Sequence, residues 1–169
     1  TAGGYVYEEG VRVPVPVNHA ELAQIAKNSG GKKYSAESLG DLRGVYQTMV
    51  DQLVARANGI LMGDPADPKT EMGPAANMPQ FERILQSIDN AVKAGAKLVA
   101  GGGRAKGEAL KDGLFIEPTI FADVTNDMEL AQTEIFGPVL AIIPFDTEQE
   151  AVALANGTPY ALACGIWTK

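Results

Sequence analysis

Few side chains in this sequence are of the kinds that carry out covalent chemistry. The single thiol, Cys164, lies in the apolar segment 163–167, where a cysteine is far more often buried and inert than a low-pKa nucleophile. The single histidine, His19, has no neighbouring ligands with which to hold a metal and no partners for a catalytic triad. Residue types therefore indicate neither a metal site nor a nucleophile.

Two further features could bind a ligand. The run Gly101-Gly102-Gly103-Arg104 has the glycine content of a phosphate-binding loop, but it lacks the following Gly-Lys-Ser/Thr and the helix that such a loop opens. We therefore predict a turn. Glu134 offers a carboxylate acceptor, and without further information we expect an acid at a helix end or in solvent.

The first forty residues predict short elements. Residues 5–7 and 11–17 are extended segments, and the prolines of the second place it at a sheet edge or in a crossing loop. Asn18 with Glu21 has the spacing of a capping box, so a helix is expected to begin there and to stop at Gly30-Gly31.

The rest of the chain alternates helices and strands. Apolar residues at three- and four-residue steps predict helices over 39–57 and 81–92, the second with Val92 on its apolar face and Gly95 as its stop. A capping box at Thr147 opens a third helix. Strands are expected at residues 97–100, 114–121, 139–145 (buried on both faces) and 163–167. This order predicts an α/β fold around a mostly parallel sheet.

Composition narrows the class of protein. The chain has 169 residues, 46% of them hydrophobic. Its net charge is -7 and its basic residues are scattered, so we do not expect it to bind nucleic acid. The longest apolar run, 139–145, is strand-sized, and no membrane anchor is predicted. One cysteine fits a reducing compartment, and we expect the cytoplasm. Because the chain begins without Met or a signal pattern, we expect it to start inside a longer parent.

From Met49 to Lys169 the sequence resembles part of the catalytic domain of the aldehyde dehydrogenase superfamily. Several motifs occur in the family's order. They are Val54-Ala55-Arg56-Ala57, Gly63-Asp64-Pro65, Met72-Gly73-Pro74, Gln80-Phe81, Gly95-Ala96-Lys97-Leu98, Glu134-Ile135-Phe136-Gly137-Pro138-Val139, Asn156, Tyr160-Ala161-Leu162 and Trp167-Thr168-Lys169. The most specific of them is residues 134–139. The resemblance implies a truncated α/β catalytic domain over residues 48–169.

The first part, residues 1–47, is similar to the last strand-helix units of a bacterial von Willebrand factor A domain. The similar stretches are Arg12-Val13-Pro14-Val15-Pro16-Val17, residues 22–26, Ser29-Gly30-Gly31 and Leu42-Arg43-Gly44-Val45-Tyr46. The metal motif Asp-x-Ser-x-Ser of such domains is not in this segment. An alternative is that Thr1-Ala2-Gly3 follows a dehydrogenase nucleophile and that an insertion separates it from the rest. The chain is then a natural fusion, an insertion, an engineered chimera or an assembly artefact.

The resemblance to the dehydrogenases also assigns roles. The matching glutamate, Glu134, hydrogen-bonds the nicotinamide ribose, and Phe136 packs near the ring; Gln80 and Arg83 match positions that approach the cofactor's ribose in some members. The cofactor of the parent enzyme is NAD or NADP, and this chain alone is not expected to bind it well. The family's nucleophilic cysteine, its glutamate base and its dinucleotide-binding domain lie upstream of the matching region, so the resemblance implies no catalytic residue in this chain.

The sequence thus predicts a fragment of an NAD(P)-dependent aldehyde dehydrogenase, inactive alone. Its parent would oxidise a small aldehyde to a carboxylic acid through a cysteine thiohemiacetal and would be a homo-oligomer. The alternative from another class is a non-catalytic binding or interaction module of von Willebrand A type, dominated by residues 1–47.

Overall fold

The computed structural model describes residues 4–8, 11–15 and 39–165, which belong to two compact units. One unit comprises residues 1–45 and 161–169 and the other residues 46–160. In the first, β1 (Gly4–Glu8) pairs antiparallel with β2 (Val11–Val15). This hairpin confirms the extended segment at residues 5–7 and the described part, 11–15, of the segment predicted at 11–17. The helix expected at residues 18–30 lies outside the described residues.

The second unit contains a three-stranded sheet with helices around it. Its elements are α2 (Leu39–Asn58, entering from the first unit), α3 (Met78–Lys93), β3 (Lys97–Ala100), β4 (Thr119–Ala122), α4 (Glu129–Gln132), β5 (Val139–Ala141) and α5 (Glu148–Asn156). The strand order is β3-β4-β5, with β3 antiparallel and β5 parallel to β4. The α/β class is confirmed, and the described sheet is mixed because only the β4 to β5 connection crosses over, through α4.

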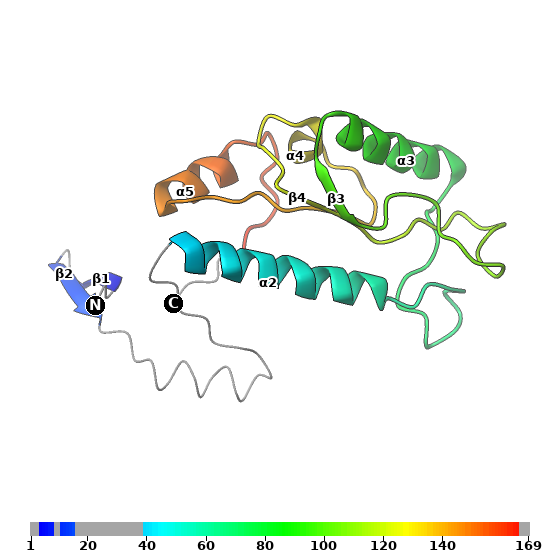
Figure 1. The fold of residues 1–169 in the computed structure, drawn as a ribbon, viewed down its shortest axis with the longest axis horizontal. Coiled ribbons are helices and arrows are strands. Elements are labelled where there is room, and N and C mark those ends of the chain that lie inside the picture. Colours follow the sequence, from blue (N-terminus) through cyan, green and yellow to red (C-terminus); the bar gives the residue numbers. More distant parts are fainter. Residues whose placement is uncertain (1–3, 9–10, 16–38, 166–169) are drawn as a thin grey trace. The chain divides into compact units, whose positions relative to one another are not determined.

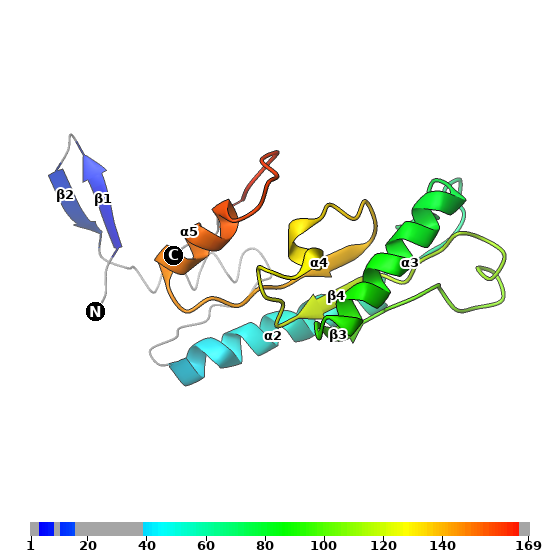
Figure 2. The same ribbon diagram turned by 90° about the horizontal axis from the view of Figure 1, so that it is seen from above.

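The central strand, β4, is buried along its whole length and supports a layer on each face. Figures 1 and 2 show α3 on one side of the sheet and α2 on the other. Phe121, fully buried, belongs to the core beneath α3, whereas Ile120 and Ala122 belong to the core beneath α2. This division follows from the two-residue alternation of side chains along a strand.

The predicted long helices are confirmed, although burial differs from prediction at single positions. Helix α2 ends at Asn58, as expected, and α3 buries four residues at helical spacing: Phe81, Ile84, Ile88 and Ala91. Val92 was expected on this face but is 47% exposed. It lies one position beyond Ala91 in the last turn, and the core continues instead to Ala96. Gly95, with φ +92°, ends the helix in the left-handed region that favours glycine.

A predicted cap is confirmed, whereas the turn predicted at residues 101–103 is not found. The hydroxyl of Thr147 accepts a hydrogen bond from the Glu150 amide at 3.1 Å and caps α5. Residues 101–103 are an irregular stretch between β3 and the antiparallel bridge of Arg104 with Ile116, so the chain does not reverse there. Gly101 has φ +65°, and a Cβ there would lie 2.4 Å from the carbonyl oxygen of Pro118. The buried hydroxyl of Thr119 stabilises this stretch by accepting from the Gly102 amide at 3.0 Å.

The strands near the end of the chain differ from prediction. β5 has three residues at the end of the strand order, and Leu140 is 43% exposed, so this strand is not buried on both faces. Residues 163–165 form no strand, and residues 166–167 lie outside the described residues. Cys164 is exposed, contrary to the buried position expected for it. No described strand pairs with its segment, so nothing there covers the thiol.

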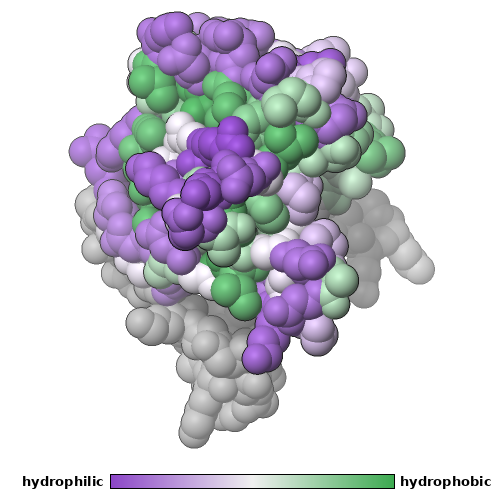
Figure 3. Space-filling model, turned by 90° about the vertical axis from the view of Figure 1, so that its right-hand side faces the viewer, coloured by the Kyte–Doolittle hydropathy of each residue, from purple (hydrophilic) through white to green (hydrophobic). Residues whose placement is uncertain are grey.

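The surface of the second unit is mixed in character. On the face drawn in Figure 3, apolar side chains lie interspersed among polar ones. None of the helices in the described residues has the length and apolar character needed to cross a membrane.

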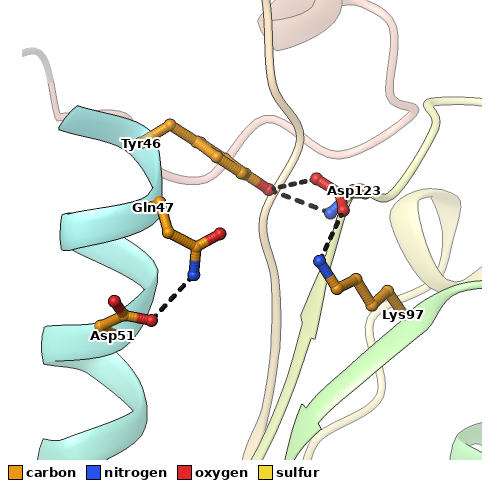
Figure 4. Close-up of polar contacts among 5 residues, drawn as sticks. All are labelled: Tyr46, Gln47, Asp51, Lys97 and Asp123. Carbon is orange, nitrogen blue, oxygen red and sulfur yellow. Dashed lines mark hydrogen bonds and ion pairs between the residues drawn. The ribbon is translucent and has the colours of Figure 1, made fainter. Parts of the chain in front are cut away.

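A tyrosine fixes α2 to the end of the central strand. The Tyr46 hydroxyl donates to Oδ1 of Asp123 at 2.9 Å and accepts from the Asp123 amide at 3.0 Å (Figure 4). Asp123 has φ +54°, and its other carboxylate oxygen lies 3.3 Å from the Lys97 ammonium. Partial burial raises the pKa of Tyr46, and the Asp123 carboxylate adds to this effect. The contact therefore stabilises the residue that follows β4 in a conformation that few non-glycine residues adopt.

We predict that Tyr46→Phe lowers the free energy of unfolding by about 1 kcal/mol at neutral pH, the net value of a lost hydrogen bond. Because the folded pKa is raised, this contribution is present below the unfolded pKa of about 10 and is lost as the pH rises through the folded value. Urea unfolding at pH 7 and from pH 9 upward measures both effects. Tyr160→Phe is the control, since the described residues give its hydroxyl no hydrogen bond and the residue is exposed. Equal alkaline loss of stability in the wild type and Tyr46→Phe would contradict the assignment.

Candidate functional site

Two of the residues singled out in the sequence, Glu134 and Phe136, lie on the loop between α4 and β5. The loop borders a hollow of about 380 Å³, within the size range of small-ligand sites. Its lining residues are Leu130, Thr133, Glu134, Ile135, Phe136, Gly137, Val139 and Ala141. Glu134 is exposed and Phe136 is 76% exposed. The loop thus presents a carboxylate and an aromatic ring at one opening.

A third singled-out residue, Gln80, holds this loop from the first turn of α3. Its side-chain amide nitrogen donates to the carbonyl oxygen of Ile135 at 2.9 Å and to that of Phe136 at 3.0 Å. Phe136 has φ +57°, an unfavourable value for an aromatic residue. The two hydrogen bonds lie on either side of this strained position and stabilise it.

Packing and backbone pairing fix the same loop further along. A Cβ at Gly137 would lie 2.6 Å from Cδ1 and 2.7 Å from Cγ1 of Ile84, which is 1% exposed. Only glycine allows the loop to approach α3 this closely. Beyond it, the Pro138 carbonyl accepts from the Thr119 amide at 2.8 Å, which starts the parallel pairing of β4 with β5.

The start of α3 is itself well anchored. The Asn77 side chain accepts from the Gln80 amide at 2.9 Å and caps the helix, and a proline occupies its first turn. Phe81 is buried, and the Arg104 guanidinium lies 5.1 Å from the centre of its ring. Gln80 therefore projects from a fixed platform.

The fourth singled-out residue, Arg83, is not brought to the loop. It is exposed on α3, and the described residues give its side chain no hydrogen bond. The sequence also did not mark Ile84 as part of the site, because it reads as an ordinary core position. The one sequence feature that points to Ile84 is the glycine at position 137, and it is informative only once α3 and the loop before β5 are known to meet.

The arrangement can bind but offers little chemistry of its own. An exposed carboxylate accepts hydrogen bonds from hydroxyl groups, and an exposed ring offers an apolar face to a planar group. No three His, Cys, Asp or Glu side chains in the described part of the chain are grouped to hold a metal ion. A second pocket, between α3 and α4, has a volume of about 40 Å³ and is too small for an organic ligand.

Comparison with known proteins connects these features to one family. The model of the Aldehyde dehydrogenase family matches residues 20–169. Betaine aldehyde dehydrogenase of Cereibacter sphaeroides is 43% identical over 126 residues, which are 75% of this chain and 25% of that protein. The chain thus spans about a quarter of the length of the curated relatives it matches.

Solved structures agree with the sequence match. A variant of aldehyde dehydrogenase from Bacillus cereus is similar with a TM-score of 0.70 and 44% identity, over 75% of this chain and 25% of that one. Aldehyde dehydrogenase of Mycobacterium tuberculosis, solved in complex with NAD+, is similar with a TM-score of 0.67 and 45% identity. The match covers 71% of this chain and 24% of that one.

We predict that Gly137→Ala destabilises the second unit by about 1–3 kcal/mol, the usual cost of overpacking a filled core. The added methyl group meets Ile84, which is enclosed and cannot move aside. Chemical denaturation measures the loss. In a double-mutant cycle with Ile84→Ala, which removes the clashing atoms, the two effects should be less than additive. Strict additivity would show that the contact does not exist.

Proposed function

The chain belongs to the aldehyde dehydrogenase family, and from this premise we propose that its second unit carries the nicotinamide side of an NAD(P) site. The observation that carries the proposal is the joint presentation of Glu134 and Phe136 at the mouth of one hollow. The relative from Mycobacterium tuberculosis that contains NAD+ supports the choice of ligand.

The residues present suit this part of the cofactor. Ribose hydroxyls are donors, and the Glu134 carboxylate is an acceptor that projects into solvent beside the hollow. Phe136 offers an aromatic face to the nicotinamide ring. When bound, the nicotinamide accepts a hydride. Gln80 and Arg83 lie on α3, where the family resemblance assigns them to the ribose, and Gln80 is the nearer of the two to the loop because it bonds it directly.

For the parent enzyme we propose oxidation of a small aldehyde to a carboxylic acid through a cysteine thiohemiacetal. The described residues of this chain include one thiol, that of the exposed Cys164, and it lies outside the unit that carries the loop. No residue of the loop is a nucleophile. We therefore propose that this chain binds the cofactor weakly and does not catalyse. The homo-oligomer and the cytoplasmic location are proposed for the whole parent enzyme.

For residues 1–47 we keep two proposals. A separate segment of von Willebrand A type is supported by the division into compact units between residues 45 and 46. An origin in the dehydrogenase is supported by the family match, which begins at residue 20, within that segment. A non-catalytic binding or interaction module remains the second candidate function, on the ground of the division into two compact units.

We predict that the purified chain shows no NAD+-dependent oxidation of short aliphatic aldehydes or betaine aldehyde. The reason is that the loop can orient a cofactor but cannot attack a carbonyl. The measurement is NADH absorbance over hours at high protein concentration. Turnover that Glu134→Ala abolishes would overturn the claim of inactivity, whereas turnover that survives this change would indicate a contaminating enzyme.

We predict that Glu134→Gln weakens NAD+ binding about tenfold, because a hydrogen bond to a charged acceptor becomes one to a neutral acceptor. Ligand-observed NMR with titration of NAD+ provides the dissociation constant. Glu148→Gln is the control, since it removes the same charge from an exposed position on α5. Equal dissociation constants for the two variants would place the cofactor elsewhere.

A further inference from the structure

We infer that Gln80 is a positioning residue, which sets the conformation of the loop that presents Glu134 and Phe136. This inference rests on the proposed function for the identity of the ligand, and on the hydrogen bonds of this chain for the role of Gln80. The role is distinct from the approach to the ribose that the family resemblance suggests for this position.

The donors of Gln80 are fully used. A glutamine amide nitrogen carries two N–H groups, and here it donates to two consecutive carbonyls, those of Ile135 and Phe136, at 2.9 and 3.0 Å. No N–H remains to offer to a ribose oxygen. A ligand could accept an N–H from Gln80 only by displacing a bond to the loop, whereas the side-chain oxygen, which these two bonds do not use, can accept from a hydroxyl group.

The two hydrogen bonds from Gln80 act at the strained residue of the loop, Phe136. Phe136 has φ +57°. For a non-glycine residue, this left-handed conformation is populated roughly tenfold less than the right-handed one, or still less. Both carbonyls that accept from Gln80 adjoin this residue or belong to it. Without the hydrogen bonds from the Gln80 side-chain amide, we expect the exposed Phe136 to leave this conformation.

The platform that holds Gln80 is rigid enough to impose the shape. The backbone amide of Gln80 donates to the capping residue Asn77. Phe81, which follows Gln80, is buried, and Ile84, one helical turn further on, packs against Gly137 of the same loop. The helix start therefore contacts the loop at two places, one polar and one apolar. The polar contact determines the direction of residues 134–136, whereas the apolar contact determines their distance from α3.

The first test measures the order of the loop by amide hydrogen exchange in NMR. Gln80→Met keeps the length of the side chain and removes its donors. We expect the amides of Thr119 and Val139, which donate to the Pro138 and Gly137 carbonyls, to exchange about tenfold faster in this variant. Amides in the middle of α3 should be unchanged. Faster exchange throughout α3, with no selective effect on the loop, would show that Gln80 merely stabilises the helix and would overturn the inference.

Gln86→Met is the matched control. Gln86 lies on the same helix and its amide bonds locally to Asn90 at 2.8 Å, so its loss should leave the exchange of the loop amides unchanged. An equal effect of the two variants would contradict a specific role for Gln80.

The second test is a double-mutant cycle on NAD+ binding. If Gln80 acts through the loop, Gln80→Met weakens binding about tenfold in the wild type and has little further effect when Glu134→Gln is present. Additive losses would show that Gln80 acts independently of Glu134, and so not through the loop, and would overturn the inference. If the unmodified chain does not bind NAD+ at all, the proposed function fails, and the exchange experiment alone decides the role of Gln80.

Discussion

The burial of β4 on both faces is the constraint on which the rest of the second unit depends. A strand without a solvent face must be covered by two layers, and its alternating side chains assign Phe121 to α3 and Ile120 to α2. The seating of α3 on Phe121 then determines where its first turn lies. Because β5 pairs with the same strand, the loop that enters β5 must pass that turn. The site is therefore a geometric consequence of one buried strand.

Two contacts of different kinds define the loop, and their magnitudes suggest a division of roles. Neutral hydrogen bonds contribute about 0.5–1.5 kcal/mol each, so the pair from Gln80 is comparable to the 1–2 kcal/mol cost of a left-handed residue at Phe136. The close approach of Gly137 to Ile84 makes any larger side chain costly, by about 1–3 kcal/mol for alanine. Packing selects the path of the backbone, and the amide selects one conformation along that path.

The sequence predicted the elements that local patterns determine. Periodicity identified α2 and α3, and the cap at Thr147 identified α5, because these signals lie within a few residues of each other. It failed where coverage by distant elements decides burial, as at Leu140, Val92 and Cys164. The family resemblance singled out Gln80 and Phe136, but nothing in the sequence indicates that these residues, which are 56 positions apart, meet. Only the tertiary fold provides that link.

The contact between Gln80 and the loop changes how the two sequence motifs should be understood. Residues 80–81 and 134–139 stand far apart in the chain and resemble separate ligand-contacting motifs, yet one supplies the donors and the other the carbonyls of a single structural unit. Glutamine is suited to this task, because its amide reaches two adjacent carbonyls without bringing a charge near Glu134. A lysine at position 80 would bring a positive charge to the loop that carries the Glu134 carboxylate, and it lacks the planar pair of N–H groups that a primary amide offers. A neutral amide therefore holds the loop without adding a counter-charge to the segment that presents Glu134.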